Sequence, residues 1–240
     1  MFTMRRSSAI LAVALALTST PASVPHPAAA ATRIPGMDIS EYQGNINWDM
    51  VGKSDIRFIF MRATKGLTYD DAKYAAYRVG ASAQNIKWTA YHYAVPDGKQ
   101  GDAVAQANHF AAVAQLAPGN ILPVLDIEQA GGLGRERLQD WVAQWLNRVH
   151  HRTGAKALIY TSPSFWRSAL GNTQRFAKHG YQLWIAHWRV HAPDVPADNW
   201  AGLGWSFWQW TNCGSVAGIT GCVDKDRYKG THIGRLVTIH

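Results

Sequence analysis

Short runs of β-branched and aromatic residues alternate with amphipathic segments over most of the chain. Each short run predicts a strand, and each segment with apolar residues three and four positions apart predicts a helix. The resulting order of strand, helix and strand is typical of a parallel sheet, and eight strands are enough to close a barrel. The predicted strands cover residues 36–42, 58–64, 87–95, 121–128, 155–162, 182–188, 205–211 and 223–228.

Three segments carry the helical pattern clearly: 70–84, 102–116 and 135–151. In the third, six apolar residues form one stripe, which we interpret as a core-packing face without a functional role for its tryptophans. Beyond residue 155 the gaps between strands are short and rich in Pro, Gly, Asp and Trp, so few full helices fit there. The predicted fold is α/β: a modified TIM-like barrel of eight strands with fewer helices and a helix-poor second half.

The first 31 residues have the order of a secretory signal peptide. Arg5 and Arg6 give a basic start, an apolar run follows over 9–17, and four alanines at 28–31 offer a cleavage site. The run is about half of the ~20 residues that span a bilayer, which disfavours the alternative of a membrane anchor. We therefore predict a secreted, extracellular protein. No linker or repeat divides residues 32–240, which predicts a single catalytic barrel domain.

The composition is that of a folded protein, with 47% hydrophobic and 17% charged residues. The formal net charge is +8, and loss of the predicted signal peptide would remove two arginines and no acid, leaving +6. Such a charge favours anionic partners, including the polymers of a bacterial envelope. The basic residues are scattered, so we expect no nucleic-acid partner and no membrane partner, and we expect a monomer.

Cys213 and Cys222 are the two cysteines of the chain, and they lie close together in a loop-like segment. Export favours a disulfide between them. The bond would close a loop of ten residues, which the chain-entropy model values at roughly 2.5–3 kcal/mol. A metal site is the alternative, but further ligands at usable spacing are missing, and we expect neither a metal nor a cofactor.

Two acidic residues end the fourth predicted strand, which reads ILPVLDIE over 121–128. Side chains alternate across a strand, so Asp126 and Glu128 point to one side while Leu125 and Ile127 face the packed helices. Barrel enzymes build their active sites at this end of the strands. Two acids in one site repel, and with no dedicated basic partner one of them keeps its proton to higher pH, as a general acid must. Capping or salt-bridged acids are the alternative.

Other predicted strand ends bring polar residues to the same mouth. Asp38 belongs to the first strand, Tyr91 and Tyr93 share a face of the third, and Asp224 and Asp226 share a face of the last. Carboxylates and tyrosines around one opening suit a neutral polyol substrate.

The chain has 11 tryptophans, several of them in two late strands. Aromatic faces stack on the apolar faces of sugar rings while neighbouring polar groups bond the hydroxyls, so this enrichment favours a carbohydrate cleft. Packing in the core is the alternative for each tryptophan. The candidate substrate-binding residues are Tyr91, Tyr93, Trp184, Trp188, Trp208, Gln209 and Trp210.

Seven motifs follow one another in order: GMDISEYQGNINW at 36–48, FIFMRATKG at 58–66, AYHYA at 90–94, VLDIE at 124–128, LWIAHW at 183–188, FWQWT at 207–211 and VDKDRY at 223–228. Any one of them is weak, but seven with barrel-like spacing are specific. Together they resemble glycoside hydrolase family 25, the Chalaropsis-type lysozymes, over essentially the whole of residues 32–240.

The resemblance implies hydrolysis of the β-1,4 bond between N-acetylmuramic acid and N-acetylglucosamine in bacterial peptidoglycan. By motif position it implies that Glu128 is the acid/base, that Asp126 is its partner, and that Asp38 and Asp224 belong to the catalytic site.

Two residues depart from the family pattern: Lys65 stands where many members carry Glu, and Asp226 stands where many carry Asn. Neither belongs to the DxE pair, but both bear on the hydrogen bonding of the cleft and on the pH optimum.

A substrate-assisted chitinase also carries DxE on a barrel strand, but its longer signature would need acids where this chain has Ile121 and Val124. A catalytically silent wall-binding module is the rival from another class. Binding alone does not require the clustered acids Asp38, Asp126 and Glu128, which argues against it.

Overall fold

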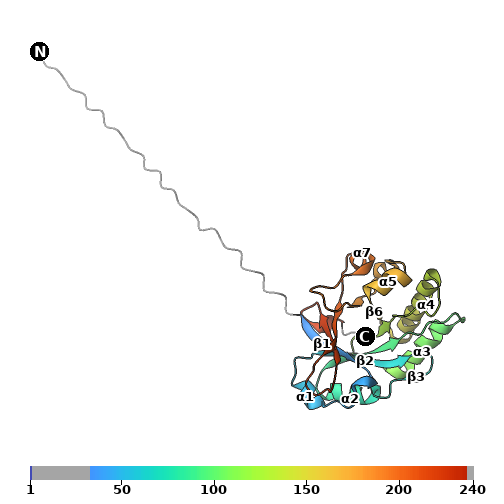
Figure 1. Ribbon diagram of the computed structural model, residues 1–240, viewed down its shortest axis with the longest axis horizontal. Helices are drawn as coiled ribbons and strands as arrows, with labels where there is room; N and C mark the ends of the chain where they lie inside the picture. The colour runs from blue at the N-terminus through green and yellow to red at the C-terminus, as the bar shows by residue number, and fades with distance from the viewer. Residues whose placement is uncertain (2–32, 237–240) are drawn as a thin grey trace. The chain divides into compact units, whose positions relative to one another are not determined.

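Eight strands close into a barrel, because β1 (Ile34–Ile39) pairs with both β2 (Phe58–Lys65) and β9 (Val223–Tyr228). The computed structural model describes Met1 and residues 33–236, so the predicted signal peptide lies outside the described residues. The strand order is β1, β9, β8, β7, β6, β5, β4, β2, β3. Figure 1 shows helices arranged around the strands. The predicted barrel of eight strands is confirmed.

The strands differ from the prediction mainly in their ends. β5 is shorter than the predicted 121–128, so Glu128 lies just beyond its carboxyl end. The two-residue strand β3 was not predicted. The remaining strands are β3 (Tyr69–Asp70), β4 (Lys87–Tyr93), β5 (Val124–Asp126), β6 (Leu158–Thr161), β7 (Leu183–Ala186) and β8 (Phe207–Gly214).

Among the eight barrel strands, one breaks the parallel order. β9 runs antiparallel to both β8 and β1, whereas β1, β2, β4, β5, β6, β7 and β8 pair in parallel. A parallel crossover needs a dozen or more residues, usually with a helix, and the chain passes from β8 to β9 through the short segment 215–222. The expectation of a purely parallel sheet is therefore wrong at this strand.

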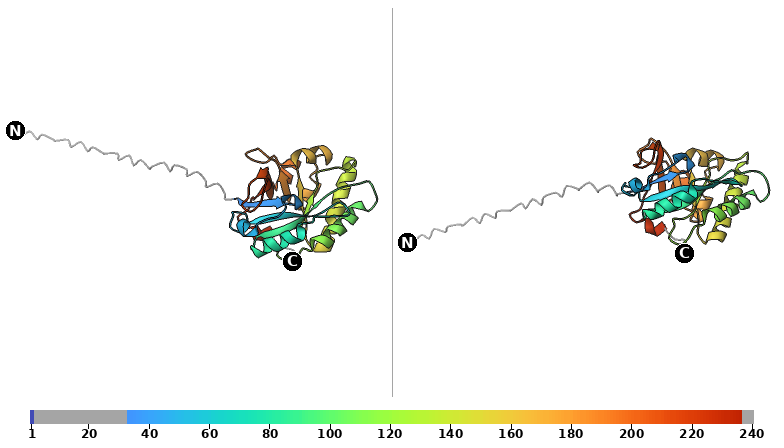
Figure 2. Two further views of the ribbon diagram at one scale, coloured as in Figure 1. Left: turned by 60° about the horizontal axis from the view of Figure 1, so that its bottom comes forward. Right: turned by 90° about the horizontal axis from the view of Figure 1, so that it is seen from below.

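The three predicted helices are confirmed with somewhat different ends, and the second half carries short helices, as expected. Figure 2 shows the helices of the first half, coloured turquoise to yellow-green, wrapped around one side of the barrel. Within residues 33–236 no helix combines the length and the apolar character that crossing a bilayer requires. The helical elements are η1 (Glu41–Gln43), α1 (Trp48–Gly52), α2 (Tyr74–Ala83), α3 (Asp102–Ala114), α4 (Arg135–Thr153), α5 (Pro163–Ala169), α6 (Arg175–Lys178), α7 (Pro196–Ala201) and η2 (Ile233–Leu236).

Side-chain alternation divides the apolar residues into two cores. Phe58 and Phe60 point into the barrel, whereas Ile59 and Met61 belong to the core between the strands and the helices. The inner core is aromatic: the ring of Trp184 lies 4.3 Å, between centroids, from the rings of Phe60 and of Tyr160. These rings fill the barrel interior and leave its mouth to polar side chains.

A disulfide joins Cys213, near the end of β8, to Cys222 in the loop between β8 and β9, which confirms that prediction. Val216 and Ile219 of this loop are buried. The carbonyl of Gly218 also accepts a 2.8 Å hydrogen bond from the amide of Asn47, which ties the loop to the start of α1. The disulfide and these contacts hold the loop at the rim of the barrel.

Candidate active site

Two carboxyl groups lie together at the carboxyl end of β5. Asp126 is 5% exposed, and Glu128, two residues further on, is exposed at the mouth. Leu125 and Ile127 are fully buried in the outer core, on the side that alternation predicted. A side-chain hydrogen bond joins the two carboxyl groups. The local strand phase therefore places both acids on the inner side of the barrel wall.

The surroundings favour the protonated forms of this pair. Burial raises the pKa of Asp126 well above its usual value, and the neighbouring charge of Glu128 raises it further. Although Glu128 has an exposed surface, the surrounding protein partly shields its carboxyl group from water and so raises its pKa, while the hydrogen bond with Asp126 opposes that rise. The pair therefore keeps a proton to higher pH than an isolated carboxyl group does.

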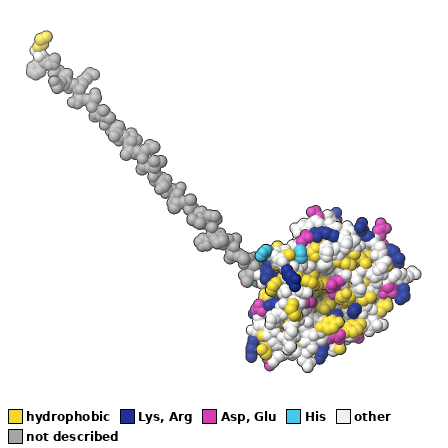
Figure 3. Space-filling model, viewed as in Figure 1, with side chains coloured by type: hydrophobic (Ala, Val, Ile, Leu, Met, Phe, Trp, Pro, Cys, Tyr) yellow, Lys and Arg dark blue, Asp and Glu magenta, His cyan; other side chains and the backbone are white. Residues whose placement is uncertain are grey.

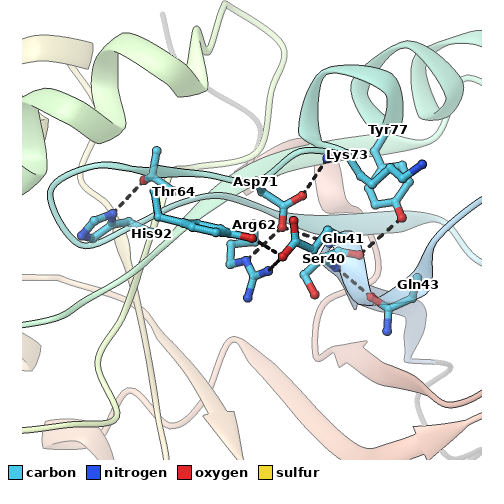
Figure 4. Close-up of polar contacts among 10 residues, drawn as sticks. Ser40, Glu41, Gln43, Arg62, Thr64, Asp71, Lys73, Tyr77 and His92 are labelled. Atoms are coloured by element: carbon cyan, nitrogen blue, oxygen red, sulfur yellow. Dashed lines mark hydrogen bonds and ion pairs between the residues drawn. The ribbon is translucent and has the colours of Figure 1, made fainter.

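The expectation that no basic residue accompanies the pair is wrong, because Arg62 of β2 is buried in the same interior. Its charge lowers the pKa of Asp126, against the larger effect of burial. Figure 4 shows the guanidinium between two acids: its Nε donates to Asp71 at 2.9 Å, and its Nη2 lies 3.5 Å from Glu41. Arg62 follows Phe58 and Phe60 at a spacing of two, so strand period alone could have placed it inside.

A second group of acids faces the first from β1 and β9. Asp38 pairs in register with Asp224, and Asp226 lies one inward position deeper, where it accepts a 2.8 Å hydrogen bond from Nε1 of Trp184. Burial raises the pKa of all three carboxyl groups, that of Asp224 to about 6, and the charges of its two neighbours raise that of Asp38 further. The mouth is therefore lined by carboxyl groups whose ionised forms are disfavoured.

Gln209 of β8 connects this second group to the cavity. It is 2% exposed, and its amide donates to Asp38 at 2.8 Å and to Asp224 at 3.4 Å. Its carbonyl oxygen accepts from the hydroxyl of Tyr160 and from Nε1 of Trp188, both at 2.9 Å. Gln209 thus orders the acids from below and offers little surface to a substrate. Sequence reasoning missed Tyr160, although it lies two residues after the inward-facing Leu158.

Two hollows lie near the mouth of the barrel, and Glu128 lines one of them. One, of about 720 Å³, is lined by Glu128 together with Tyr160, Trp188 and residues of the loops after β6, β7 and β8. The other, of about 430 Å³, is lined by Arg62, Lys65 and residues of the β2–β3 region. Tyr93 is half-buried, and the charges of Glu128 and Asp126 contribute to its raised pKa, after burial. Nζ of Lys65 lies 5.1 Å from the Tyr93 ring, so this tyrosine lies between the acid pair and Lys65.

The predicted substrate-binding tryptophans divide into three positions. Trp188 is 41% exposed and lines the same hollow as Glu128. Trp184 points inward but is 1% exposed, deep in the inner core, so its prediction as a sugar contact is wrong. Trp208, also 1% exposed, and Trp210 pack against the outer core, because Gln209 between them points inward. Their prediction as cleft residues is therefore wrong as well.

Tyr91 is buried in the inner core beside Trp184, and the charges of Asp38 and Asp126 contribute to its raised pKa, after burial. Its role as a substrate contact stays a prediction. His92, the next residue, faces the outer core, where its ring nitrogens lie 2.8 Å from Oγ1 of Thr64 and 3.0 Å from Oε1 of Gln106. Burial lowers the pKa of His92 to about 3, so it is neutral and has no acid/base function at the mouth. Across residues 33–236, no three His, Cys, Asp or Glu side chains group in a way that could hold a metal ion.

Comparison with known proteins relates this chain to one family. The family model described as glycosyl hydrolases family 25 matches residues 37–219, a range that includes Asp38, Asp126 and Glu128 and ends before Asp224. Lysozyme M1 of Streptomyces globisporus is 33% identical over 211 residues, which cover 82% of this chain and 68% of that protein. The N,O-diacetylmuramidase of Chalaropsis sp is 28% identical over 208 residues, covering 80% and 96%.

Solved structures agree with the sequence relatives. The bacterial lysozyme from Streptomyces coelicolor superposes with a TM-score of 0.80 at 31% identity, covering 88% of this chain and 98% of that one. The fold is thus shared over nearly the whole described barrel.

Proposed function

Because the chain belongs to glycosyl hydrolases family 25, and is thereby a muramidase that hydrolyses peptidoglycan, we propose that Glu128 is its proton donor. The observation that carries this assignment is the hydrogen-bonded pair of carboxyl groups at the end of β5, of which Glu128 is the exposed member. Its raised pKa keeps the proton that a general acid must deliver. Its place in the larger hollow gives it access to a polymer substrate.

In the proposed first step, Glu128 gives its proton to the glycosidic oxygen as the bond from that oxygen to the anomeric carbon breaks. In the second step the Glu128 carboxylate takes a proton from the water that attacks the anomeric carbon. Two successive displacements at one carbon give net retention of configuration. The bond cleaved is the β-1,4 bond between N-acetylmuramic acid and N-acetylglucosamine.

Asp126 has two possible tasks in the first step, and we favour the orientation of the substrate's 2-acetamido group. In that role the acetamido carbonyl oxygen attacks the anomeric carbon and forms an oxazolinium ion. A direct nucleophile and the acid must flank the scissile bond from opposite sides. Asp126 is hydrogen-bonded to Glu128, which places both on one side and fits the orienting role better.

The remaining polar groups position the sugar. Asp38 and Asp224 lie across the mouth, held by Gln209, and Trp188 presents an exposed ring in the same hollow as Glu128. We assign hydrogen bonding of sugar hydroxyls to the two carboxyl groups and ring stacking to Trp188.

Secretion is part of the proposal. A basic start, an apolar run and small residues open the chain, and a disulfide closes the β8–β9 loop. Disulfides persist in oxidising compartments, and the substrate lies outside the cell membrane.

The test is the identity of the new reducing ends. Purified peptidoglycan is digested, the fragments are reduced with borohydride, and the terminal sugar alcohols are identified by mass spectrometry after acid hydrolysis. The proposal expects muramitol; glucosaminitol would show that the other glycosidic bond is cleaved. Chitin is assayed in parallel, and its hydrolysis at a comparable rate would favour a chitinase-like specificity.

A further inference from the structure

The outer face of β8 and β9 carries a row of cations stacked on tryptophan rings. The guanidinium carbon of Arg227 lies 4.4 Å from the ring centroid of Trp210 and 5.4 Å from that of Trp208. The guanidinium carbon of Arg33 lies 5.6 Å from Trp208, and Nζ of Lys225 lies 6.0 Å from Trp210. We call Arg33, Lys225 and Arg227, with the rings beneath them, the cation row.

Strand geometry explains why these charges are gathered. On β9 the acids Asp224 and Asp226 point into the barrel, so Lys225 and Arg227 point outward. Arg33 directly precedes β1, which pairs with β9 and places Pro35 opposite Arg227. The segment between β8 and β9 contains no helix that could cover the outer face of these strands. The guanidinium groups of Arg33 and Arg227 lie over the outward ring of Trp208 instead.

Within the described residues the three cations lack acidic partners, unlike three arginines elsewhere on the barrel. Arg62, Arg167 and Arg175 each form an ion pair with an aspartate. Neither an ion pair nor a side-chain hydrogen bond joins Arg33, Lys225 or Arg227 to another residue of the described chain. Partial burial lowers the pKa of Arg227, and the nearby charge of Arg33 lowers it further, so like charges are held together.

Such a row retains its capacity for hydrogen bonding. A guanidinium that stacks through its face keeps its N–H donors free along its edge, and that fork matches the oxygens of a phosphate. Alternate residues of a strand are about 7 Å apart, so the row presents charges at intervals along a line. Over much of the face shown in Figure 3, basic and acidic side chains are interspersed. A line of unpaired cations fits a polymer with repeated negative charges better than a single small anion.

We propose that the cation row binds a linear polyol-phosphate polymer of the bacterial wall, through phosphodiester groups on Arg33, Lys225 and Arg227. Polyol carbons would pack on the exposed edges of Trp205 and Trp210. This site lies on the outside of the barrel, whereas the acids of the cleft point inward. The proposal rests on the proposed function in one respect: the wall that carries this polymer also contains the peptidoglycan that the cleft hydrolyses.

The test compares two triple variants with the same net charge. One replaces the row: Arg33→Gln, Lys225→Gln and Arg227→Gln. The control replaces three exposed lysines on other elements: Lys53→Gln, Lys87→Gln and Lys178→Gln. Affinity for purified poly(glycerol phosphate) is measured by titration calorimetry. Binding to whole walls is measured by cosedimentation in the cold, where hydrolysis is slow. The walls are compared before and after hydrofluoric acid removes their phosphodiesters.

We expect the row variant to bind the polymer at least about tenfold more weakly than the control variant. Both should hydrolyse a short soluble glycan at the wild-type rate. An equal loss of affinity in both variants would show that net charge alone causes the effect, and it would overturn the proposal. The proposal would also be overturned if the wild type bound equally well to walls with and without their phosphodiesters. If the wild type binds the polymer but leaves the glycan intact, the proposed function fails and the cation row stands.

A second variant guards against misfolding of the first. Arg33→Lys with Arg227→Lys keeps both charges and the aliphatic stems on the rings but removes the two forks. Thermal unfolding monitored by tryptophan fluorescence checks that the fold is kept. Affinity below that of the wild type is expected, and unchanged affinity would overturn the role of the guanidinium groups.

Discussion

The side-chain amide of Gln209 donates a 2.8 Å hydrogen bond to Oδ2 of Asp38 across the barrel interior. The same side chain accepts hydrogen bonds from Tyr160 and Trp188, so one neutral residue links an acid of the far wall to the hollow that holds Glu128. A neutral amide can stabilise neighbouring carboxyl groups without adding a charge of its own. This property suits a mouth where several acids already share a small volume.

Replacement of Gln209 by Leu should therefore damage both stability and activity. The variant removes the hydrogen bonds that Gln209 makes with the buried Asp38 and with the Tyr160 hydroxyl, so the free energy of unfolding should fall by about 1–3 kcal/mol. Wall lysis should fall by at least about tenfold, because the acids lose their orientation. Urea denaturation and a turbidity assay measure the two effects. Tyr160→Phe, which removes one of these bonds, should cost less, and an unaltered lysis rate in Gln209→Leu would contradict the positioning role.

Replacement of Glu128 by Gln should abolish the proton donor while keeping the side-chain shape. Turnover should fall by roughly a hundred- to ten-thousand-fold, because general acid catalysis contributes about that much. Release of reducing sugars measures the rate, and circular dichroism checks the fold. Glu136→Gln, an exposed change in the first turn of α4, is the matched control and should keep wild-type turnover. Lysis near the wild-type rate in a folded Glu128→Gln protein would refute the assignment.

Much of this fold could be predicted from local patterns. Short runs of β-branched and aromatic residues located all eight barrel strands, and alternation alone placed Leu125 and Ile127 on the outer side of β5. The spacing of Cys213 and Cys222 predicted the disulfide of the β8–β9 loop. These features depend on neighbours in sequence, which is why one chain sufficed to find them.

Local patterns could not predict how deep in the barrel a strand residue lies. They also could not predict which way side chains point after a shift in strand register. Trp184 points inward as a cleft residue would, yet it lies too deep, and only the pairing of β7 with its neighbours sets that depth. The ladder between β8 and β9 shifts register after Gln209, which makes the phase of this strand hard to read. The contacts of Arg62 with Asp71 and Glu41 likewise depend on the β2–β3 turn.

Replacement of Lys65 by Glu should move the alkaline limb of the pH profile to higher pH. Activity falls as pH rises through the pKa of Glu128, since the acid must be protonated, and burial already raises that pKa above 4.5. Lys65 lies on the far side of Tyr93 from the acid pair, so a negative charge there favours the protonated acid further. A shift of a few tenths of a unit in the profile of kcat/KM is expected, decreasing with added salt.

The control for that variant is Lys87→Glu, which makes the same charge change at the amino end of β4, the strand that ends with Tyr93. Its profile should stay close to that of the wild type. Equal shifts in the two variants would mean that net charge, and not the position of Lys65, sets the limb.

Replacement of Asp226 by Asn should change how stability depends on pH. Burial raises the pKa of Asp226 well above 3.8, so the folded state binds a proton that the unfolded state releases at lower pH. The stability linked to this group is fully present below the unfolded pKa and is lost as pH rises through the folded pKa. Asn cannot ionise, yet its carbonyl can still accept the hydrogen bond from Trp184. The free energy of unfolding of the wild type should decline as pH rises above about 4, and that of the variant should decline less. Urea titrations across this range measure both slopes; parallel slopes would show that Asp226 keeps the same proton in the folded and unfolded states.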